Sequence, residues 1–275
     1  MPNTFQIIRA DGRHFSDEGW LKTYWLFSFS DYYDPENVRF GALRVFNDDV
    51  VAPGTGFPPH THQEFEIVTI VLSGEITHED SMGNRAVVRA GDVQRMSAGT
   101  GVTHSEYNLG VKPLHSYQIW IFPKVRGLEP SYDQKSFSAA SRKNRLLPVV
   151  SGQELPDVVT MHADATIYVA DLDAGQTIEF NTDQSRCIFV YLTAGDMEIN
   201  GERLRSNDQA RITREPSLRL KAHDTTSLVL IDVPAKENGT ARQLRKARTA
   251  NPRIILLDSP IYGPDHSSDS THSCT

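Results

Sequence analysis

Two pairs of residues in the first part of the chain have types and spacing that suit metal binding. His60 and His62 stand two residues apart, and so do His104 and Glu106. On an extended strand, residues i and i+2 point to the same face. Two such pairs on neighbouring strands would bring three imidazole nitrogens and a carboxylate oxygen together. That donor set suits a first-row transition metal, and a six-coordinate ion would keep two positions open.

A single His-x-His pair is more often part of a surface strand or a packed core than a metal site. Two pairs about forty residues apart, framed by strand and hairpin patterns, favour the metal interpretation. The spacing leaves three carboxylates open as the fourth ligand. By strand alternation Glu64, Glu66 and Glu106 can each share the face of the neighbouring histidine pair.

The elements around these pairs are predicted to be strands. Short apolar runs such as EFEIVTIVLSG, HSYQIWIFP and CIFVYLTAG are separated by turn residues throughout, and helical signals are scarce before residue 236. The segments SMGNR and INGER fit tight hairpin turns, because Gly and Asn tolerate positive φ. We therefore expect an all-β chain with few short helices.

The chain also contains an internal repeat. An apolar strand, a glycine, a short strand, a hairpin turn and a further strand occur in the same order twice, so that Gly74 matches Gly195 and Asp92 matches Asp208. A repeat of about 120 residues indicates two similar barrels rather than a solenoid. We expect an N-terminal metal-binding barrel over 1–135, a C-terminal metal-free barrel over 136–235, and a partly disordered extension over 236–275.

The second copy of the repeat is not expected to bind a metal. Counting from the matched glycines places Asn181 and Asp183 opposite the first histidine pair, and counting from the matched aspartates places Leu220 opposite His104. His223 is predicted to lie at the surface, as is His78 beside its hairpin. His115 and its neighbour Tyr117 are expected to pack rather than to line the site.

Composition and charge exclude several other classes of protein. Of 275 residues, 39% are hydrophobic and 23% charged, which is ordinary for a globular chain, and the net charge is −7. An acidic surface disfavours direct nucleic-acid binding. No apolar run reaches the roughly 18 residues of a membrane span, and no signal peptide is evident. With Cys187 and Cys274 as the two cysteines, we expect a cytoplasmic protein without a disulfide framework.

The two histidine segments resemble the motifs of the cupin superfamily. Gly54, the histidine pair and Glu66 fit its first motif, while Gly91, Gly101, His104 and Asn108 fit its second with a spacing two residues longer. The block from His60 to Glu106 is similar to that of the pirin family in particular. This resemblance implies a bicupin of two stacked barrels, with metal in the N-terminal barrel alone. It also implies that the carboxylate ligand is Glu106, and it marks Glu64 as a departure, because a Gly is common there.

By the same resemblance, the chain is expected to be a metal-dependent dioxygenase that cleaves a flavonol such as quercetin with dioxygen. Glu106 would then be catalytic, as acceptor of the substrate's hydroxyl proton. Iron is the first choice of metal, and nickel, cobalt, copper, manganese or zinc would also suit the ligands. The alternative is an iron-binding, redox-responsive protein that docks on a protein partner as a transcriptional co-regulator without turnover.

Overall fold

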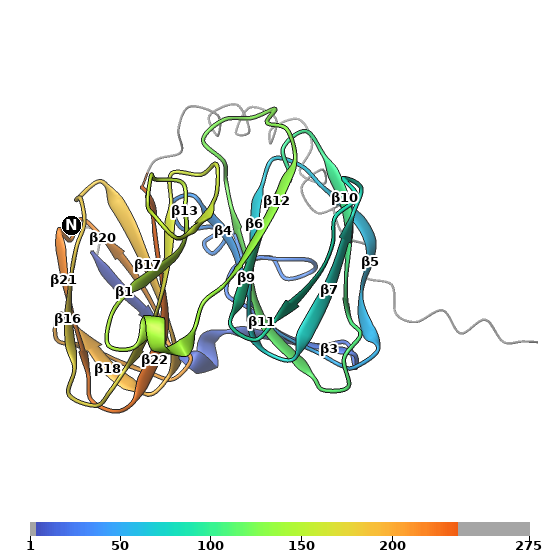
Figure 1. Cartoon of the computed structure of the whole chain (residues 1–275). Coiled ribbons are helices and arrows are strands. Elements are labelled where there is room, and N and C mark those ends of the chain that lie inside the picture. Colours follow the sequence, from blue (N-terminus) through green and yellow to red (C-terminus); the bar gives the residue numbers. More distant parts are fainter. Residues whose placement is uncertain (1–3, 236–275) are drawn as a thin grey trace, which may run out of the picture.

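The computed structural model describes residues 4–235, so the expected extension over 236–275, with Cys274, lies outside the described residues. Almost every regular element in the described part is a strand, and two 3-10 turns are its helical segments, Ala10–Gly12 and Ala139–Arg142. The strands form two halves that lie side by side (Figure 1). Each half contains one seven-stranded and one four-stranded sheet. The expected all-β, two-part cupin fold is confirmed, with each half formed as two packed sheets rather than one closed barrel.

The first half carries both histidine pairs. Its larger sheet has the order β12-β9-β6-β11-β4-β3-β2 and its smaller sheet the order β5-β10-β7-β8. The larger sheet consists of β2 (His14–Asp17), β3 (Leu21–Trp25), β4 (Leu43–Val51), β6 (Glu66–Ser73), β9 (Asp92–Ser97), β11 (Leu114–Ile121) and β12 (Ser131–Ser136). The smaller sheet consists of β5 (Thr55–His62), β7 (Glu75–Asp80), β8 (Arg85–Arg89) and β10 (Val102–Asn108).

The second half repeats this plan. Its sheets have the orders β1-β20-β17-β22-β15-β13-β14 and β16-β21-β18-β19. The larger sheet consists of β1 (Phe5–Ile8), β13 (Leu147–Ser151), β14 (Val159–Thr160), β15 (Thr166–Leu172), β17 (Arg186–Ala194), β20 (Gln209–Thr213) and β22 (Thr226–Pro234). The smaller sheet consists of β16 (Thr177–Asn181), β18 (Asp196–Ile199), β19 (Glu202–Arg205) and β21 (Ser217–Ala222).

The matched residues of the sequence repeat occupy matched places. Gly74 and Gly195 both have positive φ, 76° and 92°, and a Cβ on either would meet backbone within 2.7 Å. Asp92 accepts a hydrogen bond from the backbone N–H three residues before it at 2.8 Å, and Asp208 does the same at 3.0 Å. The repeat read from the sequence is therefore a repeat of structure.

The first strand of the chain belongs to the second half, although the strands that follow it in sequence build the first half. β1 pairs with β20 of the second half, at the position that β12 holds beside β9 in the first half. Figure 1 shows it as a dark blue strand among the orange ones. The sequence analysis placed β1 in the N-terminal barrel over 1–135 and did not predict its pairing with β20. For the rest of the chain, the division at residue 135 stays a prediction.

An apolar core joins the two halves. Phe46 of β4 packs against Phe189 and Tyr191 of β17, with ring centroids 5.3 and 5.0 Å apart. These side chains belong to one buried cluster drawn from both halves. The second half also has an apolar interior of its own. Among the described residues, no helix has the length and apolar character needed to cross a membrane.

Candidate metal centre

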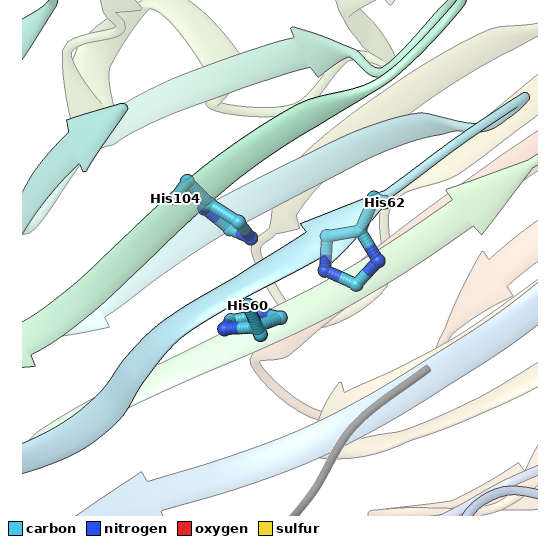
Figure 2. A group of neighbouring side chains, drawn as sticks. All are labelled: His60, His62 and His104. Atoms are coloured by element: carbon cyan, nitrogen blue, oxygen red, sulfur yellow. The ribbon is translucent and has the colours of Figure 1, made fainter. Parts of the chain in front are cut away.

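The three histidines predicted from the sequence converge in the first half. His60 and His62 come from β5 and His104 from the adjacent β10, where it pairs directly opposite His60. Figure 2 shows the three rings turned toward one another. Their centroids lie 4.5 to 5.0 Å apart, and one ring nitrogen from each lies within 4.8 Å of the others. This separation brings three nitrogens around one point.

The local sequence of β5 accounts for this approach. The pairing of β5 with β10 shifts between His60 and Phe57, where Pro58 and Pro59 provide one extra residue. Proline lacks the N–H that a ladder needs and is at home in a bulge. Before the bulge, Gly56 is required because a Cβ there would lie 2.2 Å from the Glu106 carbonyl oxygen.

Glu106 lies two residues beyond His104 on the same face and is 3% exposed. Its Oε1 accepts a hydrogen bond from Gln94 of β9, and its Oε2 accepts one from Gln118 of β11 at 3.1 Å. Both amides come from the larger sheet, so the two sheets together fix the carboxylate. The sequence analysis missed Gln94 and Gln118, since neither stands near one of the two ligand pairs in the sequence.

His78 corrects a prediction. It was expected at the surface, but it is completely buried, because it pairs opposite Glu106 and shares the buried face of the smaller sheet with it. Its Nε2 lies 3.0 Å from Asp80 Oδ2, its Nδ1 lies 3.9 Å from Glu106 Oε1, and its ring stacks on Tyr132. His78, His104 and Glu106 form a second group of potential metal ligands that overlaps the first at His104.

The polar atoms of this centre fit a metal ion. Both ring nitrogens of His104 are buried with no protein hydrogen-bond partner. His60 Nδ1 lies 2.7 Å from the Pro58 carbonyl oxygen; a proton on Nδ1 would be donated there, leaving Nε2 as the ligand atom. Buried imidazoles with unpaired nitrogens are costly unless something binds them.

Electrostatics hold the centre in the form that metals bind. Burial and the neighbouring histidines lower the pKa of His62 to about 2, and burial lowers the pKa of His104 to about 4. Burial by itself would raise the pKa of Glu106, but His78 and the other histidines hold it at about 2. At neutral pH the two imidazoles are therefore neutral and the carboxylate is ionised. Each has a free electron pair for a metal, so no proton needs to be displaced on binding.

The other two glutamates face elsewhere. Glu66 is buried, accepts hydrogen bonds from Ser97 Oγ and from the His162 backbone N–H, and so faces the second half. Glu64 has a φ of 61° and accepts a hydrogen bond from the Gly127 N–H at 3.0 Å. Its left-handed backbone explains why a Gly suits this position. Its carboxylate holds the loop around residue 127 and is not among the grouped ligands of the metal centre.

The remaining predicted residues lie outside the centre. His115 Nε2 lies 2.7 Å from Asp48 Oδ1, and Tyr117 is buried in the core between the halves, so both pack as expected. His223 is exposed, with its Nε2 3.0 Å from a Glu198 oxygen. The expectation of a surface histidine there is confirmed.

The second half has apolar side chains where the first has His60, His78, His104 and Glu106. Ile199 is the counterpart of His78, four residues after the matched glycine, and it pairs with Leu220 as His78 pairs with Glu106. Two residues earlier on β21, Leu218 pairs with Phe180 as His104 pairs with His60. The sequence count placed Leu220 opposite His104 and Asn181 opposite His60, and the strand register corrects both. None of these counterparts is a histidine.

Comparison with known proteins finds relatives that this chain matches over most of their length. Residues 8–121 match the family described as Pirin, and residues 148–233 match the family described as Quercetinase C-terminal cupin domain. A pirin-like protein of Caulobacter vibrioides is 44% identical over 218 residues, which is 79% of this chain and 94% of that protein. The chain belongs to the pirin family.

Two further pirin relatives bear on chemistry. Quercetin 2,3-dioxygenase of Escherichia coli is 38% identical over 229 residues, 83% of this chain and 98% of that one. The crystal structure of the bacterial pirin YhhW of Escherichia coli with nickel(II) superposes with a TM-score of 0.79 at 36% identity, covering 84% of this chain and 99% of that chain. The family resemblance read from the sequence is therefore confirmed, and a metal complex is known within it.

Proposed function

We propose that this protein is a metal-dependent dioxygenase that cleaves the heterocyclic ring of a flavonol such as quercetin. His60, His62, His104 and Glu106 would hold one divalent metal in the first half. The observation that carries the proposal is the convergence of three imidazoles, with both His104 nitrogens unpaired, beside a buried carboxylate. When bound, such a metal supplies a Lewis acid that favours the deprotonated form of a chelating hydroxyl.

Glu106 would serve the reaction as proton acceptor as well as ligand. Gln94 and Gln118 orient its two oxygens, and the nearby His78 Nδ1 stabilises negative charge on Oε1. A carboxylate fixed from three sides can take up a hydroxyl proton with little reorganisation. His78 lies beside Glu106, so a positive charge on its ring would balance the negative charge of the carboxylate.

Aromatic side chains next to His62 would bind the substrate's rings. Trp120 lies edge-on to His62 with centroids 4.8 Å apart, and Phe29 and Phe65 pack against Trp120 at 5.4 and 5.3 Å. An apolar wall with a few convergent polar groups is typical of sites for small aromatic molecules. This wall supports a flavonol-like ligand, with dioxygen as the second substrate.

For the metal, iron is our first choice, from the family resemblance. A bacterial pirin of known structure is in complex with nickel(II), which supports nickel as the second choice. Three imidazoles and one carboxylate suit either ion, and availability then decides between them.

The test is an aerobic ring-cleavage assay on protein purified without a nickel column, with metal content measured on the same sample. We expect about one metal per chain and loss of quercetin absorbance with oxygen uptake. His62→Ala should lose both metal and turnover while keeping its strand-rich circular dichroism spectrum. Stoichiometric metal in His62→Ala would refute the site, and metal-loaded wild type without turnover would refute the enzyme.

A further inference from the structure

The orientation of the Gln94 amide decides what Glu106 receives from the larger sheet. This buried side chain has two different ends, an N–H2 group that donates and an oxygen that accepts. Its N–H2 group donates to Glu106 Oε1 and, at 3.0 Å, to the Thr69 hydroxyl oxygen. In the opposite orientation the amide oxygen would lie against the carboxylate, and two buried acceptors would repel each other. The centre therefore depends on one orientation of this amide.

The Tyr132 hydroxyl contacts the oxygen end of the same amide. It lies 3.0 Å from Gln94 Oε1 and 2.8 Å from Gln134 Oε1, and it has one proton for both. Turning Gln94 would break the two bonds that it donates, whereas Gln134 is more exposed and can turn its N–H2 group toward the hydroxyl oxygen. The hydroxyl proton therefore goes to Gln94. Burial and the nearby Glu106 carboxylate raise the pKa of Tyr132, so the hydroxyl keeps this proton at neutral pH.

Tyr132 also connects the two sheets of the first half. It stands on β12, the edge strand of the larger sheet, and its ring stacks on His78 of β7 in the smaller sheet with centroids 4.6 Å apart. The ring thus contacts the imidazole beside Glu106, while the hydroxyl contacts the amide that donates to Glu106. One side chain therefore touches two of the three groups that surround the carboxylate.

Thr69 of β6 acts on the other end of the Gln94 amide. It is buried and pairs with Gln94 on one side and with Gln118 on the other. Because its oxygen accepts from Gln94, its own proton is directed to Gln118 Oε1, 3.4 Å away. The N–H2 end of Gln118 is then left for Glu106 Oε2 at 3.1 Å. Four hydrogen bonds thus form a closed ring that ends on both oxygens of Glu106.

The second half shows that the fold does not require these hydroxyls and amides. By strand register each residue has an apolar counterpart there, namely Phe5 for Tyr132, Ala210 for Gln94, Val190 for Thr69 and Leu230 for Gln118. Leu220 stands in that half in place of Glu106. The polar ring therefore accompanies the carboxylate, and phenylalanine and valine fit the same strand positions.

We infer that Tyr132 and Thr69 are positioning residues of the metal centre: they hold the Gln94 amide in the orientation that donates to Glu106, and so fix this carboxylate for metal binding. The inference rests on the proposed function for the role of Glu106 as a ligand. A ligand that is already held in place needs less reorganisation when a metal binds. Loss of either hydroxyl should therefore weaken metal binding, although both act through Gln94.

The test measures the affinity of the full chain for cobalt(II) by competition with a chromophoric chelator, together with the visible absorption spectrum of the bound cobalt(II). Tyr132→Phe keeps the ring and removes the hydroxyl, Thr69→Val does the same for the threonine, and Thr69→Ser restores its hydroxyl. Tyr132→Phe is also made in a Gln94→Leu background. Tyr168→Phe and Thr166→Val are the matched controls, because they remove hydroxyls from β15 in the second half. Urea unfolding of each variant without metal gives its stability.

We expect Tyr132→Phe and Thr69→Val each to weaken cobalt(II) binding by about three- to ten-fold, the effect of one neutral hydrogen bond, and to change the cobalt(II) spectrum. Thr69→Ser and both controls should bind as wild type. Gln94→Leu should itself weaken binding by roughly 10- to 100-fold. Adding Tyr132→Phe to it should cost less than about two-fold more, because the amide through which the hydroxyl acts is gone.

Three results would overturn the inference. Unchanged cobalt(II) affinity with lower stability would assign the two hydroxyls to packing. The same loss from Tyr132→Phe with and without Gln94 would show that the hydroxyl acts by another route. Equal losses in the second-half controls would show a general effect on the fold.

The outcome also separates this inference from the proposed function, because binding is measured without turnover. If the variants lose affinity as expected but metal-loaded wild type does not cleave quercetin in air, the positioning role stands and the dioxygenase fails. If wild type cleaves quercetin and the variants bind cobalt(II) as wild type does, the enzyme stands and the positioning role fails. If wild type binds no cobalt(II), the positioning role and the proposed ligand set both fail.

Discussion

At the scale of single residues, the choice of carboxylate decides the chemistry. Glu106 is fixed by two amides beside the histidines, whereas Glu66 faces Ser97 and the second half. We predict that Glu106→Gln lowers metal affinity by at least about 100-fold. Loss of a residue that only hydrogen-bonds to a metal ligand already lowers affinity roughly 10- to 100-fold, and loss of the ligand itself should cost more. Glu66→Gln should keep metal and turnover. Calorimetric metal titration of both variants checks this, and the reverse result would transfer the ligand role to Glu66.

A second residue-scale prediction concerns pH. Burial, with the nearby carboxylates Asp48 and Glu106, raises the pKa of Asp49 from 3.8 to about 7. The folded chain therefore favours the protonated acid, and the stability this gives is lost as pH rises from about 4 to 7.

Asp49→Asn should consequently gain stability relative to wild type as pH rises. From pH 5 to pH 8 the relative gain should be roughly 3 kcal/mol, because about 1.4 kcal/mol per unit applies over the two units between pH 5 and the pKa of about 7. Urea unfolding at the two pH values measures the difference. A stability difference that does not change with pH would show that Asp49 is ionised throughout.

These residues also show how far a sequence can be interpreted alone. The spacing of the histidine pairs is local, and period-two strand geometry suffices to predict that their side chains converge. Gln94, Gln118 and His78 join the centre through strand register between distant segments, which the spacing does not specify. His78 was misplaced for the same reason, because burial depends on what packs over each strand.

At the scale of elements, the β7–β8 hairpin supports the metal centre. Asp80 accepts hydrogen bonds from the Met82 N–H and from the backbone and side chain of Asn84, and the same carboxylate contacts His78. This turn therefore fixes the imidazole that faces Glu106.

We predict that Asp80→Ala weakens metal binding by roughly 10- to 100-fold without unfolding the protein, as is usual when an outer partner of a metal centre is lost. Glu79→Ala is the matched control, since Glu79 lies next to it on β7 and makes an exposed ion pair with Arg85 at 3.0 Å. Metal competition with a chromophoric chelator compares the two. Equal affinities in both variants would show that the hairpin has no part in the centre.

The positions of the strands in the sequence were largely predictable, whereas the pairing of β1 with the second half was not. The segment CIFVYLTAG, residues 187–195, was predicted as a strand and is β17, Arg186–Ala194. The four-residue strand β1 has no feature in its sequence that assigns it to the second half. Its partner β20 lies about 200 residues away, and such long-range pairing is determined by the completed sheet.

At the scale of the whole molecule, the two halves depend on each other. The core between them contains Phe46 and Tyr117 from one side and Phe189 and Tyr191 from the other. Arg95 of β9 also donates to the Thr160 carbonyl oxygen across this boundary at 2.7 Å. The second half thus supports the first through this shared core and this hydrogen bond.

We predict that a chain ending at residue 150 aggregates, although it retains every proposed ligand. It would expose the aromatic face of the first half and leave β1 without β20. Size-exclusion chromatography with light scattering checks this against the full chain. A monomeric, folded fragment that binds metal would show that the second half is dispensable.

The central claim is that one metal binds between β5 and β10 in the first half, and the most direct measurement is anomalous X-ray scattering from metal-loaded crystals at the absorption edge of the bound metal. We predict one anomalous peak per chain, bonded to His60, His62, His104 and Glu106. A peak held by His78 and Glu106 without the β5 histidines, a second peak of equal height in the other half, or no peak at all would contradict it.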